Sequence, residues 1–462
     1  MHQDNEIFSA AAIRKHAQAV RAEYETTLKS FVDIPSVSMD PAHKADIMAC
    51  AEFARNLLIA RGASAEIVPT AHYPVLIGTF HRDDSYPTVT IYNHIDVQPA
   101  DPAEWLHPPF DMVIDGDRYL GRGSTDDKGP ALAVLFAAQY AYEHHLPINI
   151  KFIWELEEEI GSPSFEQFLI DQTAAGKLAT DSVVVSDTIW VSREKPAIPY
   201  GLRGLQGVIL RLETGVKDVH SGLTGGLARN PIGEIAKIIA NAYDASSGEV
   251  HFAGFADGAA EIDEKELENF VASGFDVQKF KQAHELHKTR TEDAAQAAAS
   301  IWARPTFEVH GIVGGYTGPG VKTIVPHKAE AKISMRLVPD QDPHQVFEAF
   351  KAFVHSQNPD VEVIPEGSLK PFKGEFKGPY SEAAAAAMRA AFGKEPAFTR
   401  EGGSIGAVVS MQQVLQVPIV FLGLSLPEHG YHAINENFDW QQAMGGMVMF
   451  VEYFRRLSLL RA

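Results

Sequence analysis

The sequence predicts an α/β fold, in which a domain with a mixed, largely parallel sheet is interrupted by a smaller α+β insertion. Short apolar runs alternate with helical segments through about residue 200, a pattern typical of a sheet with helices on both faces. After Leu205 the strand-like runs become longer and amphipathic. The chain has 462 residues, too many for one ordinary core, so a second domain or an insertion is expected.

The first part of the chain carries the alternating elements. Segment 10–31 has apolar residues at helical spacing and predicts an amphipathic N-terminal helix. The expected strands are 74–80, 88–93, 149–156 and 182–186, and the expected helices are 45–61, 130–143 and 164–169.

The later part of the chain predicts a different arrangement of helices and strands, followed by a return to the first domain. Asn230-Pro231 is typical of a helix start, with a cap followed by proline. Further expected elements are strands at 207–215, 328–337 and 417–423, helices and exposed connections over 257–299, and a closing helix at 438–457. The simplest division is a discontinuous domain of residues 1–204 and 377–462, with an inserted domain of residues 205–376.

Charge and cysteine content exclude several kinds of partner and site. A formal net charge of -20 argues against nucleic acid or an anionic membrane as a partner, because both would be repelled. The single cysteine, Cys50, permits no intrachain disulfide, fits a reducing compartment and excludes a cysteine-based zinc site. The first thirty residues lack the apolar core of a signal peptide, so a cytoplasmic protein is expected.

A histidine and an aspartate stand at the end of the run 88–93. His94 would lie at the carboxyl end of a buried strand, where open α/β sheets place their ligands. Asp96 could hold the second nitrogen of the imidazole, as carboxylates often do for a metal-bound histidine. The alternative is an ordinary histidine in a turn.

A glycine-rich loop, Gly121-Arg122-Gly123-Ser124-Thr125-Asp126-Asp127-Lys128-Gly129-Pro130, carries paired carboxylates. Two carboxylates at a tight loop are unfavourable unless a cation neutralises them, so Asp126 is a candidate metal bridge. A helix-capping acidic pair on a solvated turn is the alternative.

Three successive glutamates, Glu157 to Glu159, follow the apolar run 149–156. Their mutual repulsion in a dry site would be relieved by a cation. One carboxylate can coordinate the metal while its neighbour takes a proton from water. A solvated acidic surface is the alternative.

Two more candidates follow later apolar runs. Asp187 comes directly after the run 182–186, where a turn or helix cap is the alternative. His432 lies in the loop Pro427-Glu428-His429-Gly430-Tyr431-His432-Ala433-Ile434-Asn435-Glu436, where a surface histidine is the alternative.

Taken in order, the motifs HxDVQP, GRGSTDDKGP, EEEIGS, strand-Asp and YHAINE resemble the M20 family of dinuclear metallopeptidases, in particular its cytosolic non-specific dipeptidase and carnosinase branch. The resemblance covers nearly the whole chain. It implies that Asp126 bridges two divalent ions, with His94 and Asp187 on one ion and Glu159 and His432 on the other. Zinc is the first expectation, and manganese or cobalt would also suit these ligands.

The resemblance also implies the roles of the remaining groups. Glu158 would be the general base that takes a proton from the metal-activated water and passes it to the leaving amine. Asp96 would orient His94, and the Asp126-Asp127 peptide would be cis.

The insertion would act as a lid and dimerisation domain in a homodimer. His220 would reach the neighbouring subunit's site and stabilise the developing oxyanion, and Thr323 would help to complete that site. Arg336 would hold the substrate carboxylate through its bidentate fork, and Ser404 would also contact substrate.

The expected function is therefore hydrolysis of the amide bond of dipeptides or other short peptides. A hydrolase that removes an acyl group from N-acyl amino acids shares the metal centre and is the first alternative. A catalytically silent binding or scaffold protein on the same fold is the second. Tyr431, Ala433-Ile434 and Ile160 depart from the closest branch near the ligands, so no preference for carnosine is carried over.

Overall fold

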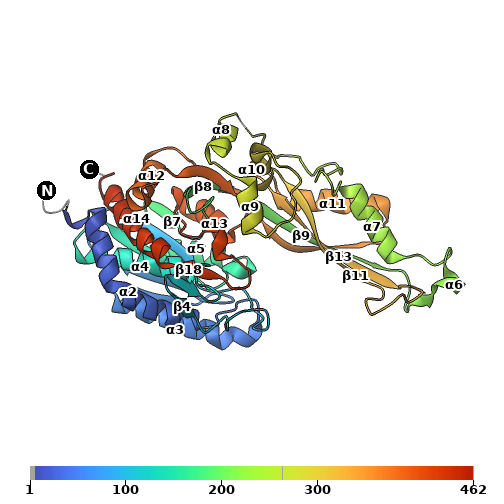
Figure 1. Cartoon of the computed structure of the whole chain (residues 1–462), viewed down its shortest axis with the longest axis horizontal. Helices are drawn as coiled ribbons and strands as arrows, with labels where there is room; N and C mark the ends of the chain where they lie inside the picture. The colour runs from blue at the N-terminus through green and yellow to red at the C-terminus, as the bar shows by residue number, and fades with distance from the viewer. Residues whose placement is uncertain (1–5, 263, 461–462) are drawn as a thin grey trace.

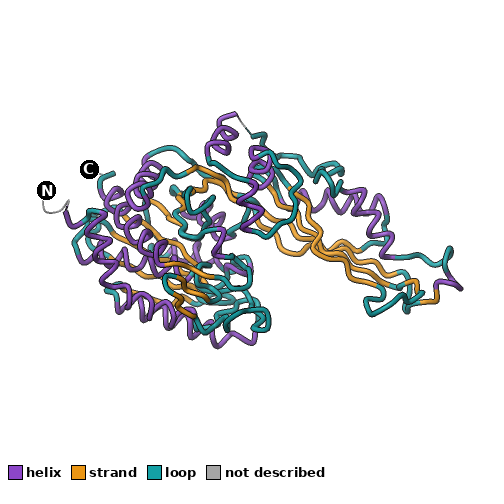
Figure 2. Tube along the Cα trace, viewed as in Figure 1, coloured by secondary structure: helices purple, strands orange, loops and turns teal. Residues whose placement is uncertain are grey.

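The computed structural model describes residues 6–262 and 264–460 and has two lobes (Figure 1). One lobe is built around a six-stranded sheet, and the other is an elongated four-stranded sheet that projects from it. Figure 2 shows helices packed around the first sheet and long strands running through the second lobe. In the described part of the chain, no helix is both long and apolar enough to cross a membrane.

The large sheet has the strand order β1-β2-β6-β3-β7-β17. Its members are β1 (Ser64–Val68), β2 (Val75–Phe80), β3 (Thr88–His94), β6 (Asn149–Glu155), β7 (Ser182–Val185) and β17 (Ile419–Phe421). The strands from β6 to β17 run parallel, whereas β1 and β2 are antiparallel to their neighbours. The predicted mixed, largely parallel sheet is confirmed.

Alternate residues of these strands enter cores on opposite faces. Phe152 and Trp154 pack with helices on one face, while Ile153 between them packs on the other. The first face is covered by α2 (Ala10–Val32), α3 (Lys44–Ala60), α4 (Lys128–Glu143), α12 (Pro379–Phe392) and α14 (Trp440–Ser458). The second is covered by α5 (Phe165–Ala174) and α13 (Gly406–Leu415).

The projecting lobe is an antiparallel sheet of order β11-β13-β9-β14. Its strands are β9 (Gly204–Glu213), β11 (Thr306–Gly314), β13 (Lys328–Leu337) and β14 (Glu362–Leu369). Helices α7 (Pro231–Ala242) and α11 (Pro343–Gln357) bury their apolar sides against this sheet. Asn230 caps α7 by accepting hydrogen bonds from the main-chain N–H groups of Ile232 and Gly233, as the Asn-Pro pair predicts.

A helical segment within the insertion packs away from the insertion sheet. Its helices are α8 (Glu264–Ala272), α9 (Val277–Ala283) and α10 (Ala294–Trp302). Helices α8 and α10 contact β16 (Ala397–Glu401), and α9 contacts η3 (Pro427–His429). Strand β16 belongs to a small sheet with β8 (Ala197–Leu202) and β15 (Phe372–Lys373). The segment therefore lies over the junction between the two lobes (Figure 1).

Short elements complete the described part of the chain. A three-stranded sheet joins β4 (Val113–Asp115), β5 (Arg118–Leu120) and β18 (Asn437–Asp439), and a two-stranded ladder joins β10 (Val219–His220) and β12 (Ile324–Val325). The remaining short helices are η1 (Pro41–His43), η2 (Glu158–Ile160) and α6 (Ser221–Thr224). Helix α6 and the β10/β12 ladder lie at the end of the projecting lobe farthest from the large sheet (Figure 1).

Candidate metal centre

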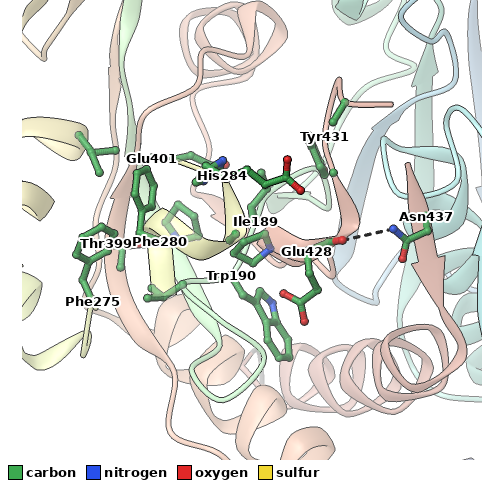
Figure 3. A pocket seen from close by; sticks show the side chains of 18 of the residues that line it. Ile189, Trp190, Phe275, Phe280, His284, Thr399, Glu401, Glu428, Tyr431 and Asn437 are labelled. Carbon is green, nitrogen blue, oxygen red and sulfur yellow. Dashed lines mark hydrogen bonds between the residues drawn. The ribbon is translucent and has the colours of Figure 1, made fainter. Parts of the chain in front are cut away.

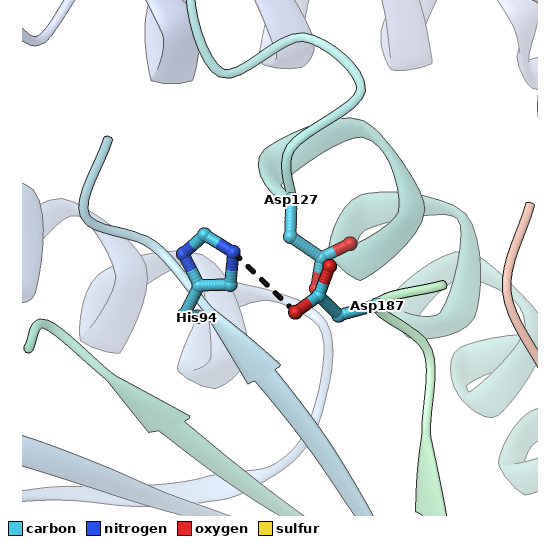
Figure 4. A group of neighbouring side chains, drawn as sticks. All are labelled: His94, Asp127 and Asp187. Atoms are coloured by element: carbon cyan, nitrogen blue, oxygen red, sulfur yellow. Dashed lines mark ion pairs between the residues drawn. The ribbon is translucent and has the colours of Figure 1, made fainter. Parts of the chain in front are cut away.

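The carboxyl ends of three parallel strands carry the central acidic and histidine side chains. His94 is the last residue of β3, η2 follows β6 closely, and Asp187 comes two residues after β7. Because β6, β3 and β7 are parallel neighbours, these residues meet at one edge of the sheet. Figure 4 shows His94 and Asp187 facing each other, with 3.7 Å between Nε2 and Oδ2.

The Asp126 carboxylate lies between two histidines. Its Oδ1 is 2.9 Å from His94 Nε2, and its Oδ2 is 3.1 Å from His432 Nε2. His432 Nε2 is also 3.2 Å from Glu159 Oε2. The structure thus brings together all five residues expected as ligands, with the Asp126 carboxylate between the two pairs.

Asp127 is a further candidate ligand that the sequence interpretation did not include. It is fully buried, and its ligand atoms lie within 4.8 Å of those of His94 and Asp187. Asn93 donates a 2.6 Å hydrogen bond to Oδ2, while Oδ1 has no hydrogen-bond partner among the described residues. The peptide bond between Asp126 and Asp127 is cis, as the resemblance implied.

Glu436 holds the loop that carries Asp126. Its carboxylate accepts hydrogen bonds from the main-chain N–H groups of Gly123, Thr125 and Asp126 at 2.9, 2.9 and 3.0 Å. The Arg122 guanidinium donates a further 2.8 Å hydrogen bond to it. Since Glu436 follows His432 by four residues, one buried side chain connects the loops of two candidate ligands.

Asp96 has more contacts than the expected one to His94. His94 Nδ1 is 3.0 Å from the main-chain carbonyl oxygen of Asp96 and 3.5 Å from Oδ1 of the Asp96 side chain. The Asp96 carboxylate also accepts the main-chain N–H groups of Glu158 and Glu159 at 3.2 and 3.1 Å, and the Ser38 hydroxyl at 2.6 Å. The residue that fixes the His94 ring therefore also fixes the start of η2.

Two residues contact the candidate ligands from outside the expected set. The Tyr431 hydroxyl donates a 3.0 Å hydrogen bond to Asp187 Oδ1, and Gln98 Nε2 donates one of 2.7 Å to Glu159 Oε2. Both residues are within motifs singled out in the sequence, but only their place in the fold shows what they contact.

The electrostatics of the cluster are those of a cation site. Burial raises the pKa of Asp187 to about 6 and raises the pKa of Asp127 and Glu158. Burial opposes charge on His432 as well, but its hydrogen bonds with Asp126 and Glu159 raise the pKa of this histidine to about 11. Burial thus disfavours charge on the acids of the cluster, while carboxylates favour a positive charge on His432. Oxygen and imidazole donors in this arrangement fit divalent cations.

Arg336 and Ser404 come together near the junction of the lobes. Arg336 Nη1 donates a 2.9 Å hydrogen bond to Ser404 Oγ, although the two residues are on different elements. Burial lowers the pKa of Arg336. A half-buried guanidinium held by a hydroxyl group is suited to a carboxylate ligand.

His220 and Thr323 also come together, but at the far end of the projecting lobe. The Thr323 carbonyl accepts the Ser221 N–H at 3.0 Å, and His220 pairs with Ile324 in the β10/β12 ladder. Both side chains are exposed. This end of the lobe is remote from the metal centre of the same chain (Figure 1), so within one subunit these residues stay apart from the other candidates.

Comparison with known proteins identifies the family. The model of peptidase family M20/M25/M40 matches residues 90–456. The human Beta-Ala-His dipeptidase is 30% identical over 461 residues, covering 95% of this chain and 90% of that protein. The Cys-Gly metallodipeptidase of Schizosaccharomyces pombe is 29% identical over 457 residues, covering 94% of this chain and 96% of that protein. The solved structure of the dipeptidase Dug1p from Saccharomyces cerevisiae has a TM-score of 0.88 at 27% identity, covering 98% of this chain and 99% of that one. The chain belongs to peptidase family M20/M25/M40.

Proposed function

We propose that this chain is a metal-dependent dipeptidase that hydrolyses the amide bond of dipeptides with Glu158 as the general base. The observation that carries the proposal is the Asp126 carboxylate between His94 and His432, beside η2. The relatives named as dipeptidases extend over nearly the whole of this chain.

His94, Asp126 and Asp187 would hold one divalent ion, and Asp126, Glu159 and His432 the other. When bound, such ions activate a water molecule and polarise the scissile carbonyl group. Asp127, which accepts a hydrogen bond from Asn93, is an alternative ligand for the ion at His94 and Asp187. Zinc suits the mixed nitrogen and oxygen ligands, and so would manganese or cobalt.

Glu158 would take the proton from the attacking water and deliver it to the leaving amine. The carboxylate of its neighbour Glu159 contacts His432 and Gln98 instead. The two adjacent glutamates would therefore have different roles. Burial raises the pKa of Glu158, which favours a group that accepts and returns a proton.

Arg336, supported by Ser404, would hold the carboxylate of the substrate. His220 and Thr323 lie too far along the lobe to serve their own site, and we propose that they complete the site of the second subunit of a homodimer. His220 would stabilise the oxyanion there. A cytoplasmic location is consistent with the single buried cysteine, Cys50.

The test is metal restoration. The purified protein is depleted with a chelator, restored separately with zinc, manganese and cobalt, and assayed on dipeptides and on N-acetyl and N-succinyl amino acids. Hydrolysis of dipeptides that depends on added metal is the expected result. Restored activity only on the acyl amino acids would favour the alternative amidohydrolase. Inactivity with each metal would favour a binding or scaffold protein.

A further inference from the structure

A cavity of about 650 Å³ lies between the helical segment α8–α10 and the loop that carries His432. One side of it is formed by β16 and by the residues that follow β7, and the other by α9 and α10. Figure 3 shows Phe275 and Phe280 toward one side of the cavity and Tyr431 and Asn437 toward the other. The cavity therefore extends from the helical segment to the loop that carries His432.

The inner end of the cavity is lined by residues that adjoin the candidate metal ligands. Tyr431 lines it, and the hydroxyl of this tyrosine donates the 3.0 Å hydrogen bond to Asp187. Ala433, the residue after His432, lines it too. A substrate whose scissile carbonyl lies at the metal centre would have this cavity directly beside it.

The outer wall of the cavity is aromatic. Phe275 packs against Phe280 and Trp302, with ring centroids 5.4 and 5.5 Å apart. His284 packs on Phe280 with centroids 4.4 Å apart, and burial lowers the pKa of this histidine. The rings of Phe275, Phe280 and Trp302 give this part of the wall an apolar surface beside Glu285, which also lines it, and this surface suits an aromatic guest.

A buried ion pair holds the wall in place. The Glu266 carboxylate on α8 accepts hydrogen bonds from Arg400 Nε at 3.1 Å and from the Tyr200 hydroxyl at 3.0 Å. Arg400 is in β16, so the pair fixes the helical segment to the sheet beneath the cavity. A wall held in this way is formed before substrate binds, which reduces the entropy lost on binding.

The position of the cavity indicates which part of a dipeptide enters it. Neither Arg336 nor Ser404 is among the residues described as its lining, so the proposed carboxylate clamp lies outside it. With the carboxyl-terminal residue held at Arg336, the residue on the acyl side of the scissile bond is the one that reaches the cavity.

We propose that this aromatic cavity receives the side chain of the amino-terminal residue of the substrate and selects bulky apolar residues, above all aromatic ones. The inference rests on the proposed dipeptidase function and adds its substrate class. Burial of a phenyl ring against this wall removes apolar surface from water, whereas a methyl group leaves most of the cavity unfilled.

The first measurement compares Phe-Gly, Trp-Gly and Ala-Gly as substrates of the metal-restored wild-type protein. We expect kcat/KM for Phe-Gly to exceed that for Ala-Gly by roughly 10- to 100-fold, as the burial of one aromatic side chain suggests. Equal kcat/KM values would overturn the cavity assignment while leaving the dipeptidase function intact. Hydrolysis of no dipeptide at all would instead overturn the proposed function.

The second measurement fills the cavity. Ala283 is an exposed residue of α9 that lines it, so Ala283→Trp adds bulk without disturbing a core. Ala272→Trp is the matched control, because Ala272 is an exposed alanine of α8 outside the described lining.

Ala283→Trp should lower kcat/KM for Phe-Gly about tenfold and change that for Ala-Gly less than about twofold. The Ala272→Trp protein should retain the wild-type ratio. An unchanged ratio of Phe-Gly to Ala-Gly in the Ala283→Trp protein would contradict the assignment.

Discussion

The Glu436 carboxylate accepts the main-chain N–H of Asp126 at 3.0 Å, which couples the loop after β17 to the loop before α4. The same carboxylate pairs with Arg122 at 2.8 Å, and Glu436 is fully buried. Asp126 lies in the loop before α4 and contacts His94 and His432 from there. The alignment of the candidate bridging carboxylate therefore depends on a residue that is not itself a candidate ligand.

Replacing Glu436 should damage both stability and metal binding. Glu436→Ala leaves the Arg122 guanidinium buried without its partner, and breaking such a pair costs about 3–5 kcal/mol. Urea unfolding of the metal-free protein measures that loss, and calorimetric titration with zinc measures metal affinity. The control is Glu395→Ala, which removes an exposed pair with Arg389 and should cost less than about 1 kcal/mol. Wild-type zinc affinity in the Glu436→Ala protein would refute the role given to this residue.

Glu158→Ala should abolish turnover while metal remains bound. The variant removes the proposed base but none of the proposed ligands, so the loss in kcat should be about 100-fold or more. Metal content per subunit, measured after gel filtration, should equal that of the wild type. Glu166→Ala, at an exposed position in the first turn of α5, should retain activity and metal. Metal loss in the Glu158→Ala protein would mean that Glu158 is a ligand.

Asp96→Ala should weaken metal binding although Asp96 lies behind His94. The substitution removes the acceptor for the N–H groups of Glu158 and Glu159, and the His94 ring loses a neighbouring carboxylate. Loss of such a supporting group typically costs about 10- to 100-fold in metal affinity. Competition with a zinc indicator measures this change. An unaltered affinity would show that the main-chain carbonyl of Asp96 is sufficient to orient His94.

Strand positions near the site were largely predictable, because their residues alternate or form short apolar runs. Strand β13 has the predicted bounds, and the buried positions of Lys328–Leu337 alternate along most of its length. Strand β11 was not predicted. Its register shifts between Val309 and Gly311, and much of the strand is only partly buried, so its sequence lacks a clear period.

The candidate ligands were identified from motifs, but their supporting contacts required the fold. Glu436 ends the motif YHAINE, but its role could not be read from that motif, because its hydrogen-bond partners are more than three hundred residues away along the chain. Asp127 was missed for a different reason. Adjacent aspartates look alike in a sequence, and only the loop geometry turns both toward His94.

The carboxylate clamp can be tested with paired substrates. For the wild-type protein, kcat/KM for a dipeptide should exceed that for its carboxyl-terminal amide by roughly 10- to 150-fold. This factor corresponds to the contribution of about 1.5–3 kcal/mol from a hydrogen bond to a charged group. Arg336→Met should remove this difference, since neither substrate then has a charged partner. Arg211→Met is the control, because Arg211 lies on neighbouring strand β9 and pairs with Glu330 on the exposed surface. An acid-to-amide preference that survives in Arg336→Met would place the clamp elsewhere.

The proposed exchange of His220 between subunits predicts complementation of inactive variants. His220→Ala and Glu158→Ala homodimers should each be nearly inactive. When equal amounts are mixed and allowed to exchange, about half of the dimers contain both chains, and one of the two sites in each has Glu158 together with the partner's intact His220. The mixture should recover about a quarter of wild-type activity.

The matched control for this complementation combines both substitutions in one chain. Mixing His220→Ala with the double variant His220→Ala/Glu158→Ala provides Glu158 in one subunit but no His220 in either, so activity should remain at the level of the single variant. Recovery in this control would show that His220 is dispensable. Failure of the first mixture to recover, with exchange verified by two different affinity tags, would show that His220 does not act across the dimer. Because His220 and Thr323 lie together at the far end of the projecting lobe, Thr323→Val should complement Glu158→Ala in the same manner.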